Sequence, residues 1–188
     1  MEQIEVVPLE HRALVAYLQE RGIPAHIAKT KCREAHYSVN GKRYFAVAFE
    51  NISGGWELRN RYFKGCRGRK DISYQPWARD GPSTECVMFE GFIDYLSALT
   101  LEIISGADAI ILNSVVYVNK AVPYLKGYNA INCYLDNDNA GQTALAELTA
   151  IYGSTVIDRS TLYSEFNDLN EYLTNQSFTK NTLSNENK

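Results

Sequence analysis

The 188-residue sequence lacks several features that would place it in a common class. Its longest apolar runs are far too short to cross a bilayer, and no signal peptide opens the chain, so we expect no association with a membrane. The sequence has only four cysteines and three histidines, which are widely separated and include no Cys-x-x-Cys pair. A structural zinc site is therefore disfavoured, and we expect reduced thiols and a cytoplasmic location.

A strong excess of charge of one sign is also missing when the chain is taken as a whole. The net charge is −3 and 45% of the residues are hydrophobic, which is typical of a soluble globular protein and argues against a uniformly basic nucleic-acid binder. The average hides one local excess. Residues 56–79 hold seven basic and only two acidic side chains, so the sequence predicts a local anion-binding surface.

Two patterns of hydrophobic spacing divide the chain. Residues 1–80 predict two short helices and then an antiparallel meander over residues 34–75, whose first hairpin turns at Asn40-Gly41. After a linker at residues 76–83, strands and helices alternate, which is typical of a parallel sheet covered by helices. We therefore predict an α/β fold: a small basic α+β subdomain (1–80), a Rossmann-like parallel-sheet domain (81–175) and a polar, disordered tail (176–188).

Acidic side chains follow two strands of the predicted parallel sheet. Glu90 ends the first strand, Asp136 ends the third, Asp138 comes just after it, and Asp94 lies one helical turn beyond Glu90. Ligands of open α/β sheets collect at the carboxyl ends of strands. Carboxylate oxygens are the ligands that hard divalent cations prefer. The sequence therefore predicts a Mg²⁺ site, which Mn²⁺ could also fill, formed by these four side chains.

Two other interpretations of the acidic residues compete with the metal site. A single carboxylate at the start of a helix often serves only as a cap or as a favourable charge on the helix dipole. An Asp-x-Asp pair after a strand also occurs in phosphatases that form an aspartyl phosphate. There we would expect the pair after the first strand of the sheet, with a lysine downstream, whereas here it follows the third strand. The set as a whole favours the metal site.

Six basic side chains define what we call the basic strip: Arg59, Arg61, Lys64, Arg67, Arg69 and Lys70. Two of them, Arg59 and Arg61, are two residues apart in an expected strand, which would place both on one face. Such a surface suits the backbone phosphates of single-stranded nucleic acid or the triphosphate of a nucleotide, and these contacts carry no sequence preference. For Arg67 and Arg69, the alternative is an ordinary solvated loop.

Three segments resemble the TOPRIM signature shared by bacterial DNA primases, topoisomerases and some nucleases. Two of them, EGFIDYLSAL (90–99) and LDNDNAGQTAL (135–145), are most similar to the primase branch. The third, NDLNEYL (167–173), resembles the Lys-Asp-x-Asn-Glu segment that closes this domain, with Asn167 in place of the lysine. The Gly-Thr after the family's second strand appears here as Asn113-Ser114.

The resemblance extends upstream and assigns a role to each matching residue. Residues 45–73 resemble the basic subdomain of primase-like proteins from mobile bacterial elements, with Arg59 and Lys70 at the matching basic positions. In the TOPRIM domain, Glu90 would act in catalysis. Asp136 and Asp138 would bind Mg²⁺ and take part in catalysis through it.

The activity implied by the resemblance is that of a DNA primase acting in DNA replication. Such an enzyme performs magnesium-dependent nucleotidyl transfer from nucleoside triphosphates and makes RNA primers on a single-stranded DNA template. The zinc-ribbon and helicase-binding regions of primases are not found in this sequence, so we expect them in a longer protein or in a partner. Two alternatives stay open: a TOPRIM nuclease that cuts phosphodiester bonds, and a non-catalytic module that binds single-stranded DNA.

Overall fold

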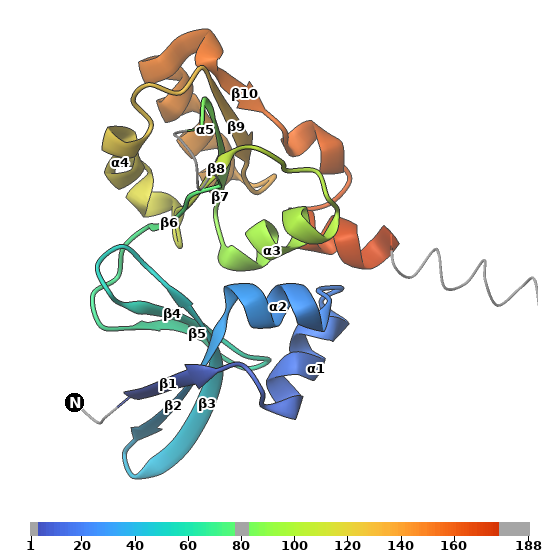
Figure 1. The fold of residues 1–188 in the computed structure, drawn as a ribbon. Helices are drawn as coiled ribbons and strands as arrows, with labels where there is room; N and C mark the ends of the chain where they lie inside the picture. Colours follow the sequence, from blue (N-terminus) through green and yellow to red (C-terminus); the bar gives the residue numbers. More distant parts are fainter. Residues whose placement is uncertain (1–3, 78–82, 177–188) are drawn as a thin grey trace, which may run out of the picture. The chain divides into compact units, whose positions relative to one another are not determined.

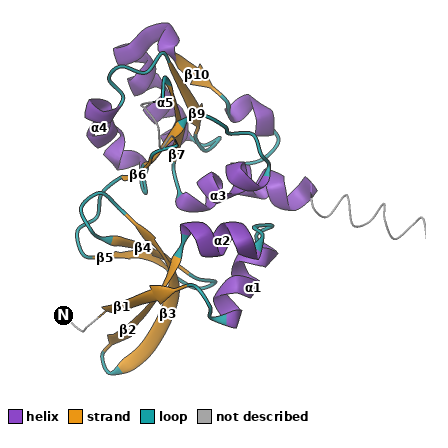
Figure 2. Cartoon of the chain, viewed as in Figure 1, coloured by secondary structure: helices purple, strands orange, loops and turns teal. Residues whose placement is uncertain are grey.

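The structure is a computed structural model that describes residues 4–77 and 83–176. It divides the chain into two compact units, Met1–Asp71 and Ile72–Lys188, which are described separately below (Figures 1 and 2). Within the described residues, no helix is long and apolar enough to cross a membrane. The predicted disordered tail lies outside the described residues from 177 onward, as do residues 78–82 of the predicted linker.

The first unit is an antiparallel sheet of five strands in sequence order, with two helices between the first two strands. Its elements are β1 (Ile4–Pro8), α1 (Arg12–Glu20), α2 (Ala25–Lys31), β2 (Arg33–Val39), β3 (Lys42–Glu50), β4 (Trp56–Arg59) and β5 (Lys64–Arg67). The predicted meander is present, but β1 was not foreseen. It pairs with β2 and extends the sheet by one strand.

The hairpin between β2 and β3 turns where the sequence predicts it. Asn40 and Gly41 have φ angles of 52° and 75°, and these left-handed values match the twist of a two-residue hairpin turn. Val39 pairs with Lys42 directly across the turn. The turn therefore fixes the register of β2 against β3, and so determines which side chains share a face of this sheet.

The second unit is a mostly parallel sheet in the order β10-β9-β7-β8-β6, with only β6 antiparallel. Its strands and helices are β6 (Ser73–Gln75), β7 (Glu85–Phe89), α3 (Phe92–Thr100), β8 (Asp108–Ile111), α4 (Val118–Ala121), β9 (Ala130–Tyr134), α5 (Asn139–Tyr152) and β10 (Val156–Asp158). Residues 169–176 are also helical. The predicted α/β fold class is confirmed. The division after Asp71 falls upstream of residue 80, because β6 pairs with β8 rather than with the meander.

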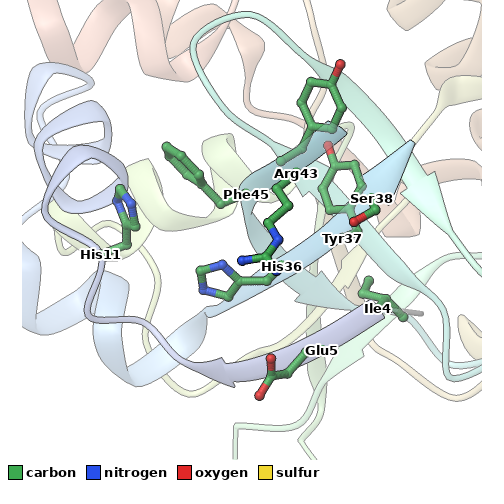
Figure 3. A pocket seen from close by; sticks show the side chains of 9 residues that line it. Ile4, Glu5, His11, His36, Tyr37, Ser38, Arg43 and Phe45 are labelled. Carbon is green, nitrogen blue, oxygen red and sulfur yellow. The ribbon is translucent and has the colours of Figure 1, made fainter. Parts of the chain in front are cut away.

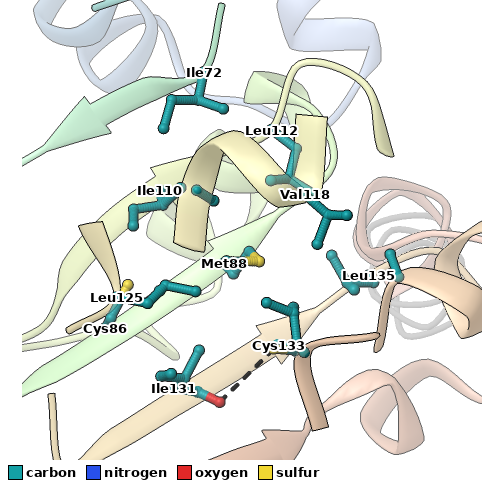
Figure 4. Close-up of a cluster of buried hydrophobic side chains, with 13 residues drawn as sticks. Ile72, Cys86, Met88, Ile110, Leu112, Val118, Leu125, Ile131, Cys133 and Leu135 are labelled. Atoms are coloured by element: carbon teal, nitrogen blue, oxygen red, sulfur yellow. Dashed lines mark hydrogen bonds between the residues drawn. The ribbon is translucent and has the colours of Figure 1, made fainter. Parts of the chain in front are cut away.

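The core of the second unit lies between the sheet and the helices that cover it. On one face, Met88 and Cys133 pack among a cluster of buried residues that includes Val118 of α4 and Leu148 of α5 (Figure 4). On the other face, Phe89 packs against a ring of α3, since successive strand residues point to opposite sides. With both faces buried, β7 and β8 carry a polar side chain only at their first residue, whereas β9 has a buried polar residue, Asn132, at its centre.

All four cysteines have free thiols, and three of them are buried. Burial raises the pKa of the Cys32 and Cys133 thiols to about 12. At neutral pH these side chains are therefore neutral core residues rather than nucleophiles.

Candidate active site

The two aspartates of the sequence motif lie on the loop between β9 and α5. Asp138 is the N-cap of α5: its Oδ1 accepts hydrogen bonds from the backbone N–H groups of Ala140 (2.9 Å) and Gly141 (2.8 Å). The capping interpretation is therefore correct for one oxygen of Asp138. Both of these bonds use the same oxygen atom, so the cap role leaves Oδ2 available for another ligand.

Glu90, at the end of β7, lies against this loop. Its Oε1 accepts a hydrogen bond from the backbone N–H of Asp136 at 3.1 Å. The approach is close enough to require glycine at position 141. A Cβ atom there would lie 2.8 Å from Glu90 Oε1 and would collide with the carbonyl oxygen of Asp136. The Gly that follows the aspartates thus makes room for the two acidic strand ends to meet.

Asp94 occupies the first turn of α3 and is buried, with 9% of its surface exposed. Its Oδ1 accepts the backbone N–H of Asn170 at 3.2 Å, and the Asn170 side-chain amide donates to Ser97 Oγ at 2.9 Å. The segment NDLNEYL is therefore attached to the same helix that carries Asp94. Its buried asparagine orients a carboxylate instead of contacting solvent.

Asn137, between the two aspartates, anchors their loop to the chain near residue 165. Its side-chain Nδ2 donates to the carbonyl oxygens of Tyr163 (3.0 Å) and Phe166 (2.8 Å), and its backbone N–H donates to the carbonyl oxygen of Asn167 (2.7 Å). Three hydrogen bonds from one residue thus fix the segment that precedes Asp168.

These contacts gather enough negative charge to change the ionisation of Asp136. Burial raises the pKa of Asp136, and the carboxylates of Asp94, Glu90, Asp168 and Asp138 raise it further, to about 8. Without a bound cation, Asp136 therefore holds a proton at neutral pH. Asp168 is the member of this group that the sequence analysis did not single out, although it stands in the quoted NDLNEYL segment.

The residues present fit a divalent cation by their chemistry. All are carboxylates, which hard cations prefer, and the pKa of Asp136 is raised by its burial and by neighbouring negative charges that a cation would neutralise. Over residues 4–77 and 83–176, however, no three His, Cys, Asp or Glu side chains already converge in an arrangement that could hold a metal ion. Glu90, Asp94 and Asp138 instead accept backbone N–H groups, and ligation would use their second oxygens.

The basic strip lies in the first unit and is partly engaged there. Arg59 Nε donates to the Tyr17 hydroxyl at 3.3 Å, and Arg61 forms an ion pair with Glu20 of α1. The guanidinium of Arg67 lies over the ring of Tyr37, 4.7 Å from its centroid. The expectation that Arg59 and Arg61 share one strand face is wrong, because β4 ends at Arg59.

One pair in the strip does share a face. Arg59 of β4 pairs directly with Lys64 of β5. Like charges directly opposite each other destabilise an antiparallel pair, so an anion bound between them would relieve the repulsion.

Comparisons with known proteins agree with this architecture. Residues 87–173 match a family model described as Toprim-like, and residues 3–68 match one described only as a domain of unknown function, DUF8464. No curated protein matches the chain. The boundary between the two matches falls where the structure divides into its two units.

Several solved structures share the fold. The primase fragment of the bacteriophage T7 primase-helicase protein is 18% identical, with a TM-score of 0.61 over 84% of this chain and 69% of that chain. T7 primase domains bound to an RNA/DNA hybrid and dTTP, in a complex with the T7 lagging-strand DNA polymerase, are 15% identical, with a TM-score of 0.55 over 84% of this chain and 80% of that chain. The zinc-binding and RNA polymerase domains of the Aquifex aeolicus primase are 13% identical, with a TM-score of 0.53 over 95% of this chain and 56% of that chain.

Residues 87–173 therefore form a Toprim-like domain. The fold of the chain is similar to that of the primase structures.

Proposed function

We propose that the chain is the catalytic core of a primase-type nucleotidyltransferase that makes RNA primers on single-stranded DNA. The observation that carries the proposal is the cluster of carboxylates around Asp136, where burial and the neighbouring negative charges together raise the pKa of Asp136 to about 8. A group so disfavoured in its charged form is a candidate for a functional site. The TOPRIM-like fold and the primase-like architecture support the choice of reaction.

In the proposed reaction, the 3′ hydroxyl oxygen of the growing primer attacks the α-phosphorus of a nucleoside triphosphate, and pyrophosphate leaves. Asp136 and Asp138 would hold Mg²⁺, together with Asp94. When bound, the ion supplies positive charge that neutralises the triphosphate and favours an in-line displacement. Glu90 would accept the proton of the 3′ hydroxyl or act as a further ligand.

The basic strip would hold phosphate groups of the template or of the triphosphate. Arg59 and Lys64 are the best placed, because they stand opposite each other on one face of the sheet. Template recognition would also need a zinc-ribbon or helicase partner, which the sequence analysis expects. The Aquifex primase structure, which includes a zinc-binding domain, is matched over 56% of its length.

A primer-synthesis assay tests the proposal. The protein would be incubated with a single-stranded template, the four nucleoside triphosphates and Mg²⁺ or Mn²⁺, with and without a zinc-ribbon partner. Asp136→Asn should abolish the product. Asp158→Asn is the matched control: Asp158 ends the neighbouring strand β10, its Oδ1 accepts the N–H of Ser160 at 2.9 Å, and asparagine keeps that acceptor.

The same incubation with plasmid or single-stranded DNA and no nucleotides addresses the alternatives. Cleavage that Asp136→Asn removes would replace the primase proposal with a TOPRIM nuclease. Neither synthesis nor cleavage, combined with DNA binding that Asp136→Asn leaves intact, would indicate a non-catalytic binding module.

A further inference from the structure

A hollow in the first unit is lined by neither the carboxylates nor the residues of the basic strip, although Arg67 of the strip lies over the ring of Tyr37, which is part of the lining. It has a volume of about 930 Å³ and is formed by β1, the β2–β3 hairpin and the start of α1 (Figure 3). Sites for small organic ligands typically occupy about 300–1,000 Å³. The volume is therefore adequate for a ligand, and the chemistry of the lining decides which class.

The register of the sheet places five of the lining side chains on one face. Glu5 of β1 pairs with His36 of β2, which pairs with Phe45 of β3, so these three form a row across the strands. Ser38 and Arg43 form the next row on the same face, because side chains alternate along a strand. The lining of the hollow thus includes an aromatic ring, a cationic side chain and several hydrogen-bonding groups.

The aromatic part of the lining is a stacked pair. The rings of Phe45 and His11 lie 4.0 Å apart between centroids, with 26° between their planes, and 37% of Phe45 is exposed. His11 Nδ1 accepts the N–H of Ala13 at 3.2 Å. In the neutral ring the proton is then on Nε2, which makes His11 a hydrogen-bond donor beside the Phe45 ring.

A buried carboxylate holds this arrangement in place. Glu34 Oε2 accepts the backbone N–H groups of Glu10 (2.8 Å) and His11 (2.6 Å), and Glu34 Oε1 lies 2.8 Å from His36 Nε2. Burial alone would raise the pKa of Glu34, but these hydrogen bonds outweigh burial and lower it. The ionised carboxylate therefore fixes both histidines before any ligand arrives, which reduces the ordering cost of binding.

Arg43 supplies the charge. It is exposed, and it lies two residues from Phe45 on the same strand, about 6.7 Å along the strand axis. This spacing suits a ligand whose flat ring and anionic group are a few ångströms apart. An arginine beside an exposed aromatic ring binds phosphate and base together in sites for single-stranded nucleic acid.

We propose that this hollow binds a nucleotide unit, with its base stacked on Phe45 and its phosphate on Arg43. The unit could be a free nucleotide or one residue of a single strand, and both offer the same chemistry. Glu5, at the far end of the first row, would accept a hydrogen bond from an amino group of the base. The site is distinct from the proposed catalytic carboxylates and needs no metal ion.

Fluorescence polarisation tests this site in the presence of EDTA, so the result does not depend on catalysis. The probes are a fluorescent 12-residue deoxyadenylate strand, an abasic strand of the same length, and unlabelled AMP as a competitor. The wild-type chain should bind the base-bearing strand about tenfold more tightly than the abasic strand. Phe45→Ala should remove that preference, and Phe45→Leu, which keeps apolar volume without a ring, should remove it too.

Arg43→Gln should weaken binding of both strands by at least threefold. Lys42→Gln is its matched control, because the adjacent residue carries the same charge on the opposite face of β3, and it should cost less. Competition by AMP identifies a free nucleotide as a ligand, whereas binding of the strand alone identifies a nucleotide within a strand.

Two results would overturn the proposal. One is an unchanged base preference in both Phe45 variants, if circular dichroism shows that they are folded. The other is equal binding of the two strands by the wild type. The measurement is made in EDTA and needs no catalysis, so failure here is distinct from failure of the proposed catalytic function.

Discussion

At the scale of single residues, the sequence locates the acidic positions but not the contacts that bring them together. Glu90 and Asp136 could be placed at one sheet edge because parallel strands end on the same side. The hydrogen bond from the Asp136 N–H to Glu90 depends on backbone geometry that no motif encodes. Asp168 was missed for a similar reason, since its effect on Asp136 arises from the contacts of Asn137 and Asn170 rather than from spacing.

Replacing Gly141 by alanine should change the stability of the protein in the direction opposite to the usual one. Replacing a glycine inside a helix by alanine ordinarily stabilises a protein by up to about 1 kcal/mol. Here the added Cβ would collide with the Asp136 carbonyl and crowd Glu90. Gly141→Ala should therefore destabilise the fold by about 1–3 kcal/mol in urea unfolding. Gln142→Ala, at an exposed position of the same helix, should be nearly neutral, and a stabilising Gly141→Ala would contradict the described approach of Glu90.

The raised pKa of Asp136 gives a pH dependence without metal. The folded protein keeps a proton that the unfolded chain releases near pH 4, so stability should fall as pH rises from about 4 to 8. Asp136→Asn should remove this loss and be more stable than wild type at pH 8 by about 1–3 kcal/mol, allowing for solvent screening. Urea unfolding at pH 5 and pH 8 with EDTA measures the difference. Equal pH slopes for the wild type and the variant would show that Asp136 is ionised throughout.

At the scale of secondary-structure elements, periodicity predicted most of the fold and failed where segments are short. The hairpin turn and the alternation of β7 to β10 with helices were foreseen, because each pattern spans many residues. The strand β1 has only five residues, and β6 has only three. Such short runs do not reveal which sheet they join. The shared face expected for Arg59 and Arg61 failed because β4 ends between them.

The loop between β9 and α5 depends on Asn137. Asn137→Ala would leave the carbonyl oxygens of Tyr163 and Phe166 without this donor. The variant should lose about 1–3 kcal/mol of stability and bind Mn²⁺ several-fold more weakly, because the loop that carries both aspartates is no longer anchored. Asn139→Ala, at an exposed neighbouring position, is the control. If calorimetry gave equal Mn²⁺ affinities for the two variants, Asn137 would have no anchoring role.

At the scale of the whole molecule, a basic surface belongs to one unit and an acidic site to the other. The net charge of −3 hides this division, so composition alone would have argued against nucleic-acid binding. The resemblance of the motifs to TOPRIM proteins was confirmed by the family match and the solved structures. The role of the basic strip stays a prediction.

The salt dependence of DNA binding tests the strip. Each phosphate contact on a single strand contributes a slope of about −0.7 in log K against log salt. Replacing Arg59, Arg61 and Lys70 by alanine should flatten the slope by roughly two if all three touch phosphate. A control triple variant at exposed basic residues outside the strip, Arg12, Arg33 and Lys126, should change it little. An unaltered slope in the strip variant would show that these residues are only solvated surface.

The central claim is that the carboxylates at the sheet edge bind a divalent cation, and calorimetric titration with Mn²⁺ tests it most directly. The double variant Asp136→Asn, Asp138→Asn is suitable because asparagine is also a good N-cap, so the start of α5 is kept. We predict that the wild type binds Mn²⁺ and releases a proton near pH 7, and that the double variant, still folded, does neither. An unchanged Mn²⁺ affinity in the double variant would contradict a cation site formed by these carboxylates.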